Sequence, residues 1–170
     1  SGDFTNYFEV WRNEIEALEF IEWYGKLNIK YKILIAGNHD AFAFKRSYIL
    51  KKLCVENNII YLENDFIEIE GLKIWGSPMT PTFGNWYFMK DRSKLYKFWE
   101  NIPLDIDVLV THGPPKTILD VSHKRDNSIE NCGCNSLKTI VIEKRNIGLH
   151  LFGHIHNNKD IINAGTLKLS

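Results

Sequence analysis

The chain has 170 residues, and its 21 Lys and Arg balance 21 Asp and Glu to a net charge of zero, which argues against binding nucleic acid through overall positive charge. Its 44% hydrophobic and 25% charged residues predict a single globular domain, and no apolar stretch approaches the ~20 residues that span a bilayer. An odd number of cysteines, three, favours reduced thiols, so we expect a soluble, cytoplasmic protein without membrane contact.

Helices and strands are predicted to alternate along the chain. Apolar residues at three- and four-residue steps predict an amphipathic helix that ends at Gly25. Its expected buried stripe contains Trp11, Ile15, Leu18, Ile21 and Tyr24. The compact apolar run 31–36 predicts a buried strand. The elements predicted after it are a helix at about 47–57, a strand at 59–62, a hairpin of 66–69 and 72–75, a helix at 93–101, a strand at 108–111, a helix at 136–144 and a strand at 149–152.

Three of the predicted strands end in polar clusters. These clusters are Asn38-His39-Asp40, His112 with Gly113, and His154-Ile155-His156. Ligands of open α/β folds bind beyond the carboxyl ends of the strands, so we expect the three clusters to form one site.

The residue types in these clusters favour hard or borderline metals. His154 and His156 are two residues apart, so on an extended backbone both side chains would point the same way and could each bind one of two neighbouring metals. Asn38 offers an amide oxygen, His112 an imidazole and Asp3 a carboxylate that can bridge two cations. This mixed set suits Mn, Fe, Zn or Mg. Taken alone, each histidine is more simply explained as a structural polar residue, and the joint occurrence favours a metal site.

Four motifs resemble the calcineurin-like metallophosphoesterases: Gly2-Asp3, Gly37-Asn38-His39-Asp40, His112-Gly113 and Gly153-His154-Ile155-His156. Gly76-Ser77-Pro78 and Asn85-Trp86 make the chain most similar to the small metallophosphoesterase-domain-containing proteins. The resemblance covers nearly the whole chain. It implies an α/β fold, the αββα sandwich of two mixed sheets flanked by helices, formed by one domain over residues 1–170.

The resemblance also implies a role for each matched ligand residue. Asp3 would bridge two divalent metal ions, with Asn38, His112 and His154 completing the second metal and His156 binding the first. The family's opening Asp-x-His motif does not occur in this sequence. We therefore interpret the chain as lacking the first strand and the C-terminal strands of the family, which leaves the first metal site incomplete.

The implied reaction is phosphodiester hydrolysis by attack of a hydroxide that bridges the metals. His39, held by Asp40, would protonate the leaving group. Asn85 and Trp86 would contact a small-molecule phosphodiester, for which cyclic nucleotides are candidates, whereas nucleic acid is not expected. For Trp86, packing in the core is an equal alternative. The second hypothesis for the whole chain is a degenerate metallophosphoesterase fold that acts as a non-catalytic binding or scaffold module.

Two further features have simple structural interpretations. Cys132 and Cys134, with His123 nearby, could bind zinc, but their C-x-C spacing is not that of usual structural zinc sites, and we favour reduced loop thiols. Tyr87 and Phe88 follow Trp86, and we expect both to pack in the core.

Overall fold

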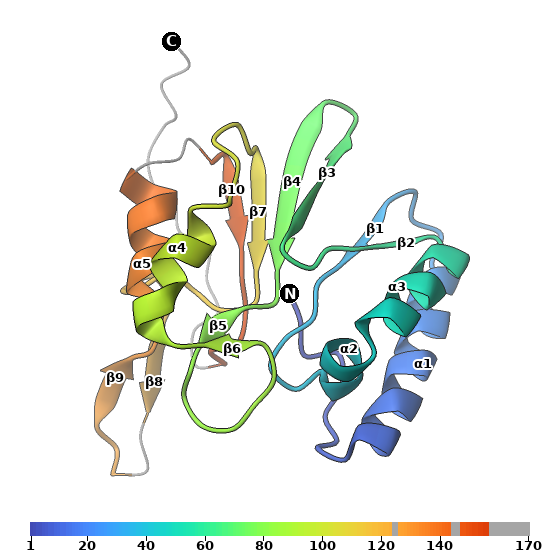
Figure 1. Ribbon diagram of the computed structural model, residues 1–170, viewed down its shortest axis with the longest axis horizontal. Coiled ribbons are helices and arrows are strands. Elements are labelled where there is room, and N and C mark those ends of the chain that lie inside the picture. The colour runs from blue at the N-terminus through green and yellow to red at the C-terminus, as the bar shows by residue number, and fades with distance from the viewer. Residues whose placement is uncertain (124–125, 144–146, 157–170) are drawn as a thin grey trace.

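Two β-sheets lie face to face between two groups of helices in the computed structural model, which describes residues 1–123, 126–143 and 147–156 (Figure 1). The helices are α1 (Val10–Lys26), α2 (Ala41–Lys45), α3 (Ser47–Glu56), α4 (Leu95–Trp99) and α5 (Asn135–Lys138). The strands are β1 (Lys32–Leu34), β2 (Ile59–Tyr61), β3 (Asp65–Ile69), β4 (Leu72–Ser77), β5 (Thr80–Pro81), β6 (Met89–Lys90), β7 (Val108–Thr111), β8 (Val121–His123), β9 (Ile129–Asn131) and β10 (Leu149–Leu151).

The first sheet consists of the parallel pair β1 and β2, covered by α1, α2 and α3. Parallel strands need a crossover, and the chain between β1 and β2 supplies α2 and α3 for it. Ala17 and Ile21 of α1 pack with Leu34 of β1 and Leu50 of α3 in one apolar cluster. This cluster joins the first two layers of the fold.

The second sheet has the strand order β10-β7-β4-β3 and is mixed. β10, β7 and β4 run parallel, so their C-terminal ends meet at one edge, whereas β3 and β4 form the predicted antiparallel hairpin. Trp75 and Leu109 pack with α4 and α5, and the alternating neighbour Ile74 faces the first sheet with Ile35 and Leu62. The four layers confirm the predicted αββα sandwich.

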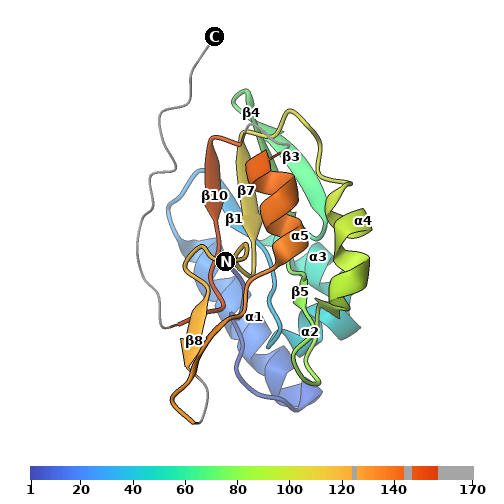
Figure 2. The same ribbon diagram turned by 90° about the vertical axis from the view of Figure 1, so that its left-hand side faces the viewer.

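The N-terminus lies beside the C-terminal ends of β7 and β10 in both views of the molecule (Figure 1 and Figure 2). β5 pairs with β6, and β8 pairs with β9, as small additional sheets. Among the described residues, no helix has the length and apolar character needed to cross a bilayer.

The predicted buried stripe of α1 is largely wrong. Trp11 is 61% exposed, and Ile15 and Leu18 also face outward, whereas the buried residues of the helix are Asn13, Ala17 and Ile21. The face of the helix that carries Asn13 is turned inward because Asn13 binds the segment after β1. Its Nδ2 donates a hydrogen bond to the His39 carbonyl, and its Oδ1 accepts one from the Phe42 amide. The apolar periodicity correctly predicts an amphipathic helix, but the hydrogen bonds of Asn13 determine which face of it is buried.

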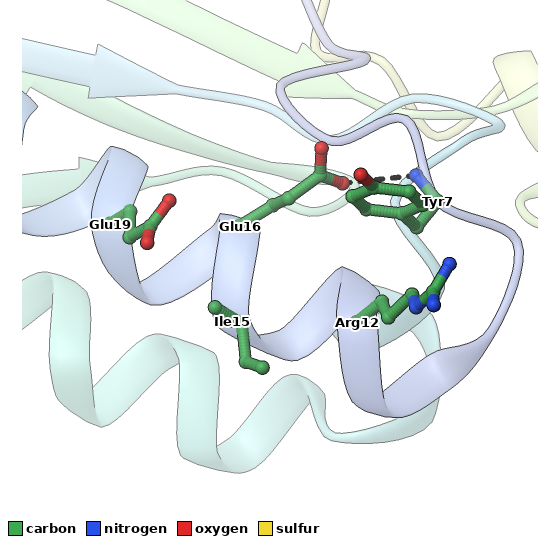
Figure 3. A pocket seen from close by; sticks show the side chains of 5 residues that line it. All are labelled: Tyr7, Arg12, Ile15, Glu16 and Glu19. Carbon is green, nitrogen blue, oxygen red and sulfur yellow. Dashed lines mark hydrogen bonds between the residues drawn. The ribbon is translucent and has the colours of Figure 1, made fainter.

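The outer face of α1 carries a hollow of about 380 Å³ (Figure 3). Its lining residues are Tyr7, Arg12, Ile15, Glu16 and Glu19. The Glu16 carboxylate accepts a hydrogen bond of 2.9 Å from the backbone N–H of Tyr7 and so fixes one wall of the hollow. No residue of the predicted metal site lines it.

Two of the predicted helices are shorter than expected. The region 93–101 contains a 3-10 turn at Arg92–Lys94 followed by α4, and the region 136–144 contains α5 followed by a π-helical turn at Thr139–Glu143. The Asp91 side chain caps the first of these by accepting a hydrogen bond from the Ser93 amide.

Candidate metal centre

Asp3, Asn38 and His112, which we call the inner group, meet at the C-terminal edge of β7. His112 directly follows β7 and is 1% exposed. Its Nε2 lies 2.8 Å from Asn38 Oδ1 and 3.2 Å from Asp3 Oδ2, and its Nδ1 lies 2.7 Å from the Ser1 carbonyl oxygen. The structure thus brings together three residues that are far apart in the sequence.

The partners of His112 are all hydrogen-bond acceptors. A carbonyl, an amide oxygen and a carboxylate cannot donate, and a neutral imidazole has one N–H to offer. In the neutral tautomer that donates Nδ1–H to the Ser1 carbonyl, the lone pair of Nε2 faces the oxygens of Asn38 and Asp3. In that tautomer the three lone pairs repel one another unless a cation lies between them. The inner group therefore fits a divalent metal with nitrogen and oxygen ligands.

Gly37 lets the inner group form. A Cβ atom at this position would lie 2.5 Å from His112 Cε1 and would collide with the Asp3 carboxylate, so no other residue fits between the two ligands. The Asp3 carboxylate is also held from the next residues of that loop, because its Oδ1 accepts a 2.8 Å hydrogen bond from the His39 amide.

Asp40 is fully buried and binds backbone rather than His39. Its two oxygens accept hydrogen bonds from the amides of Asp3, Thr5 and Gly37 and from the Thr5 hydroxyl. Burial raises the pKa of Asp40 to about 7, against the lowering effect of these hydrogen bonds. The predicted support of His39 by Asp40 is therefore wrong, because the carboxylate is used to hold the loop that carries Asp3.

Thr5 and Asn13 are parts of this support that the sequence did not reveal. Asn13 Nδ2 contacts the Thr5 hydroxyl and the His39 carbonyl oxygen, each at 2.8 Å. Both residues are buried polar residues in an apolar environment, and their signal in the sequence is weak: a polar position on the α1 face that also carries Ala17 and Ile21. They connect α1 to the loop of the inner group.

His154 joins the inner group from the end of β10. Its ring centroid lies 4.8 Å from that of His112, and one ligand atom from each of Asp3, His112 and His154 lies within 4.8 Å of the other two. Its buried Nδ1 has no hydrogen-bond partner. Burial, followed by the nearby His112, lowers the pKa of His154 to about 4, so the ring is in the neutral form that can bind a metal.

The predicted extended backbone at His154 is wrong. His154 has φ of 70°, and the Ile155 amide donates a 2.8 Å hydrogen bond to the Gly153 carbonyl, which closes a three-residue γ-turn. Such a turn breaks the two-residue alternation of side chains on which the shared direction of His154 and His156 depended. His156 is exposed and lies outside the group of ligand atoms formed by Asp3, His112 and His154. We call His154 and His156 the outer group.

His39 lies beside the inner group and under an aromatic ring. The Trp86 ring centroid is 4.4 Å from that of His39, and the buried Nδ1 of His39 has no hydrogen-bond partner. Trp86 is half-buried and Asn85 is exposed. Phe88 belongs to the apolar cluster of α1 and β1 and Tyr87 packs against it, which confirms the packing role expected for these two residues.

Phe83 is a site neighbour that the sequence did not single out. Its ring centroid lies 5.1 Å from that of His154, and its side chain is 49% exposed. Nothing in its sequence position distinguishes it from other loop aromatics. The β5–β6 loop thus contributes aromatic rings next to two of the site histidines.

The cysteines take part in packing. The buried Cys134 Sγ accepts hydrogen bonds from the Trp99 indole N–H at 3.3 Å and from the Leu137 amide. Within the described ranges, the group of metal-competent side chains is that of Asp3, His112 and His154, and it includes neither cysteine.

Comparison with known proteins agrees with this geometry. The family model described as calcineurin-like phosphoesterase matches residues 1–158. Human metallophosphoesterase domain-containing protein 1 is 35% identical over 188 aligned residues, which cover 98% of this chain and 56% of the human protein. The chain thus spans about half the length of that relative.

Two further proteins share the fold or part of the sequence. A protein of Emericella nidulans named probable rhamnogalacturonate lyase C is 39% identical over 148 residues, which cover 80% of this chain and 13% of that protein. A solved crystal structure superposes with a TM-score of 0.59 at 19% identity, covering 92% of this chain and 63% of the other. The structural match supports the sandwich fold.

Proposed function

Because the chain belongs to the calcineurin-like phosphoesterase family, we propose that it hydrolyses phosphodiesters at the centre formed by Asp3, Asn38, His112 and His154. The observation that carries this proposal is the approach of two ligand oxygens to His112 Nε2, Asn38 Oδ1 at 2.8 Å and Asp3 Oδ2 at 3.2 Å. A divalent metal bound among them would supply Lewis-acid polarisation of the phosphoryl group.

His39 is the proposed general acid. It is next to Asn38 in the chain, its carbonyl is fixed by Asn13, and its ring is partly exposed beside the proposed ligands. An imidazole in this place can donate a proton to the leaving oxygen. Trp86 limits the rotation of the ring by packing against it at 4.4 Å. Positioning of His39 therefore rests on Asn13 and Trp86 rather than on Asp40.

The proposed substrates are small phosphodiesters, with cyclic nucleotides as candidates. The half-buried Trp86 and the exposed Asn85 offer a flat apolar surface and an amide beside the site. The proposed cofactors are two divalent ions among Mn, Fe, Zn and Mg; Asp3 would contribute to the first, and His156 would have to move to reach it. We also propose a cytoplasmic location, which the three free cysteines support because reduced thiols are typical of that compartment.

Hydrolysis of bis(p-nitrophenyl) phosphate by the purified chain with Mn²⁺ tests this function, with p-nitrophenyl phosphate as the monoester comparison. We expect release of nitrophenolate from the diester, loss of both activity and bound metal in His112→Ala, and loss of activity with retained metal in His39→Ala. His123→Ala, outside the site, should match the wild type in both. Loss of metal from His39→Ala would refute the assigned role, and hydrolysis that survives His112→Ala would refute the site.

The second candidate is a non-catalytic binding or scaffold module. The position of His156 favours it, because this exposed side chain lies outside the group of ligand atoms and leaves the first metal with Asp3. A chain that binds one metal, loses it in His112→Ala and hydrolyses neither ester would support this candidate over the enzyme.

A further inference from the structure

One loop places aromatic rings next to two histidines of the site. The loop 82–88 connects β5 to β6, and it packs Phe83 against His154 at 5.1 Å and Trp86 against His39 at 4.4 Å between ring centroids. The two histidines come from different sheets, since His39 follows β1 and His154 follows β10. The loop therefore contacts the site at two separate points.

A series of contacts connects these two points. The His154 ring contacts the His112 ring, and His112 contacts the Asp3 carboxylate. This carboxylate accepts a hydrogen bond from the backbone N–H of His39. Phe83 packs against His154, the first residue of this series, and Trp86 packs against His39, the last. The proposed metal ligands and the two aromatic rings therefore belong to one connected set of contacts.

The length of the chain between Phe83 and Trp86 limits how far apart their backbones can be. Phe83 and Trp86 are three residues apart, so their Cα atoms are separated by at most about 11 Å. Gly84 between them has φ of 130°, a conformation that side chains disfavour, and this bend lets the loop turn both rings toward the site.

Both rings are held in place but leave surface free. The Phe8 ring packs edge-on against Trp86 at 5.8 Å, and the Phe83 amide donates to Met89 Sδ at 3.4 Å. Phe83 nevertheless leaves 49% of its side chain exposed. An apolar ring with a fixed backbone and a free face beside a polar centre is suited to stacking.

We propose that Phe83 is a specificity-determining residue, which together with Trp86 selects phosphoesters that carry a flat aromatic group. This inference rests on the proposed phosphodiesterase function and adds a substrate feature to it. A stacked ring gains dispersion and apolar contact on the free face of Phe83, whereas an alkyl ester gains neither. The aromatic group can be a nucleobase or an aryl group, because each presents a planar π-face.

The test uses three diesters with the same nitrophenolate leaving group: thymidine 5′-p-nitrophenyl phosphate, phenyl p-nitrophenyl phosphate and methyl p-nitrophenyl phosphate. We expect the wild type to prefer at least one aromatic ester over the methyl ester in kcat/KM, and the favoured ester identifies the source of the ring. Phe83→Ala should reduce this preference about tenfold, the size expected for one lost stacking contact. An unchanged preference in Phe83→Ala would overturn the inference.

Phe66→Ala is the matched control, since Phe66 lies on β3 with a similar exposure of 51%. It should keep the wild-type preference, and Phe83→Tyr should keep most of it. The metal content of Phe83→Ala should equal that of the wild type, because loss of metal would show that Phe83 acts only through His154.

A binding experiment separates this inference from the proposed function. If the wild type hydrolyses none of the esters, the proposed function fails, and calorimetry with thymidine 5′-phosphate and methyl phosphate then decides the inference. Tighter binding of the thymidine compound, reduced about tenfold by Phe83→Ala, would support it. Equal affinities of the wild type for both compounds would overturn it.

Discussion

The inner group and the outer group of the candidate metal centre are constructed in different ways. Asn38 and His112 are almost fully buried, and the loop that carries Asp3 is fixed by the hydrogen bonds of Asp40. His154 lies on a γ-turn with a positive φ, a conformation that Asp3 shares, and His156, in contrast to the inner group, is exposed. Buried polar contacts fix the inner group, whereas the outer group lies on a strained turn.

This difference indicates how the centre would bind metal. A group that is already in position loses little conformational entropy on binding, so the inner group is suited to hold a metal tightly. The outer group contributes one side chain, His154, to the same place. We therefore expect affinity to come mainly from the inner group, and the following experiments test this expectation.

The largest effect should come from Asp40→Ala. This change leaves three amides and the Thr5 hydroxyl without their buried acceptor, so we expect a loss of about 3–5 kcal/mol in the free energy of unfolding. Urea denaturation at pH 8, above the raised pKa of Asp40, measures it. Asp126→Ala is the control, because Asp126 also binds an amide and a hydroxyl but at the surface, and it should cost less than about 0.5 kcal/mol. A loss below about 1 kcal/mol for Asp40→Ala would show that the loop has other support.

The inner group could be predicted from the sequence because strand ends are easy to locate. β1 and β7 lie in compact apolar runs that end in polar residues, Asn38 after the first and His112 after the second, and ligands of such folds bind beyond the carboxyl ends of the strands. The hairpin of β3 and β4 was equally visible, since two alternating segments flank Glu70 and Gly71. Local sequence patterns were sufficient to predict strands and a hairpin, because a few neighbouring residues determine these structures.

The outer group and the support of the site could not be predicted, because they depend on distant contacts. The γ-turn at His154 follows no local signal, since a non-glycine residue with positive φ is disfavoured in any sequence. The partners of Asp40 are 35 to 37 residues away for Thr5 and Asp3. The buried face of α1 was decided by Asn13, whose contacts also lie outside the helix.

The second effect concerns metal affinity directly. His112→Ala removes a nitrogen ligand from the inner group, and we expect it to weaken Mn²⁺ binding at least about 100-fold, since even supporting residues of metal sites change affinity 10–100-fold. Titration calorimetry measures the change. His150→Gln, on β10 and outside the ligand group, should bind Mn²⁺ as the wild type does. Equal affinities of wild type and His112→Ala would place the metal elsewhere.

The third effect is a pH dependence in β10, the strand that leads to the outer group. Burial lowers the pKa of His150 to about 3, while its Nε2 lies 2.8 Å from the Thr111 hydroxyl. The unfolded chain protonates this residue near pH 6.5, so the folded state loses stability as the pH falls from 6.5 toward 3. We expect a loss of about 2 kcal/mol from this residue between pH 6.5 and pH 5. Urea denaturation of His150→Gln should give a correspondingly flatter curve, and parallel curves would exclude His150 as the cause.

The smallest effect is expected for His156→Ala, and it is the most direct comparison of the two groups. Because His156 is exposed and outside the cluster of Asp3, His112 and His154, its removal should change the affinity of the tightest Mn²⁺ site less than about twofold. His123→Ala, another exposed histidine, shows the effect of losing an imidazole that is far from the motifs. A loss above about tenfold for His156→Ala alone would mean that the turn rearranges to bring His156 to the metal. The two groups would then be one coupled site, and the rigidity of the inner group would not by itself determine affinity.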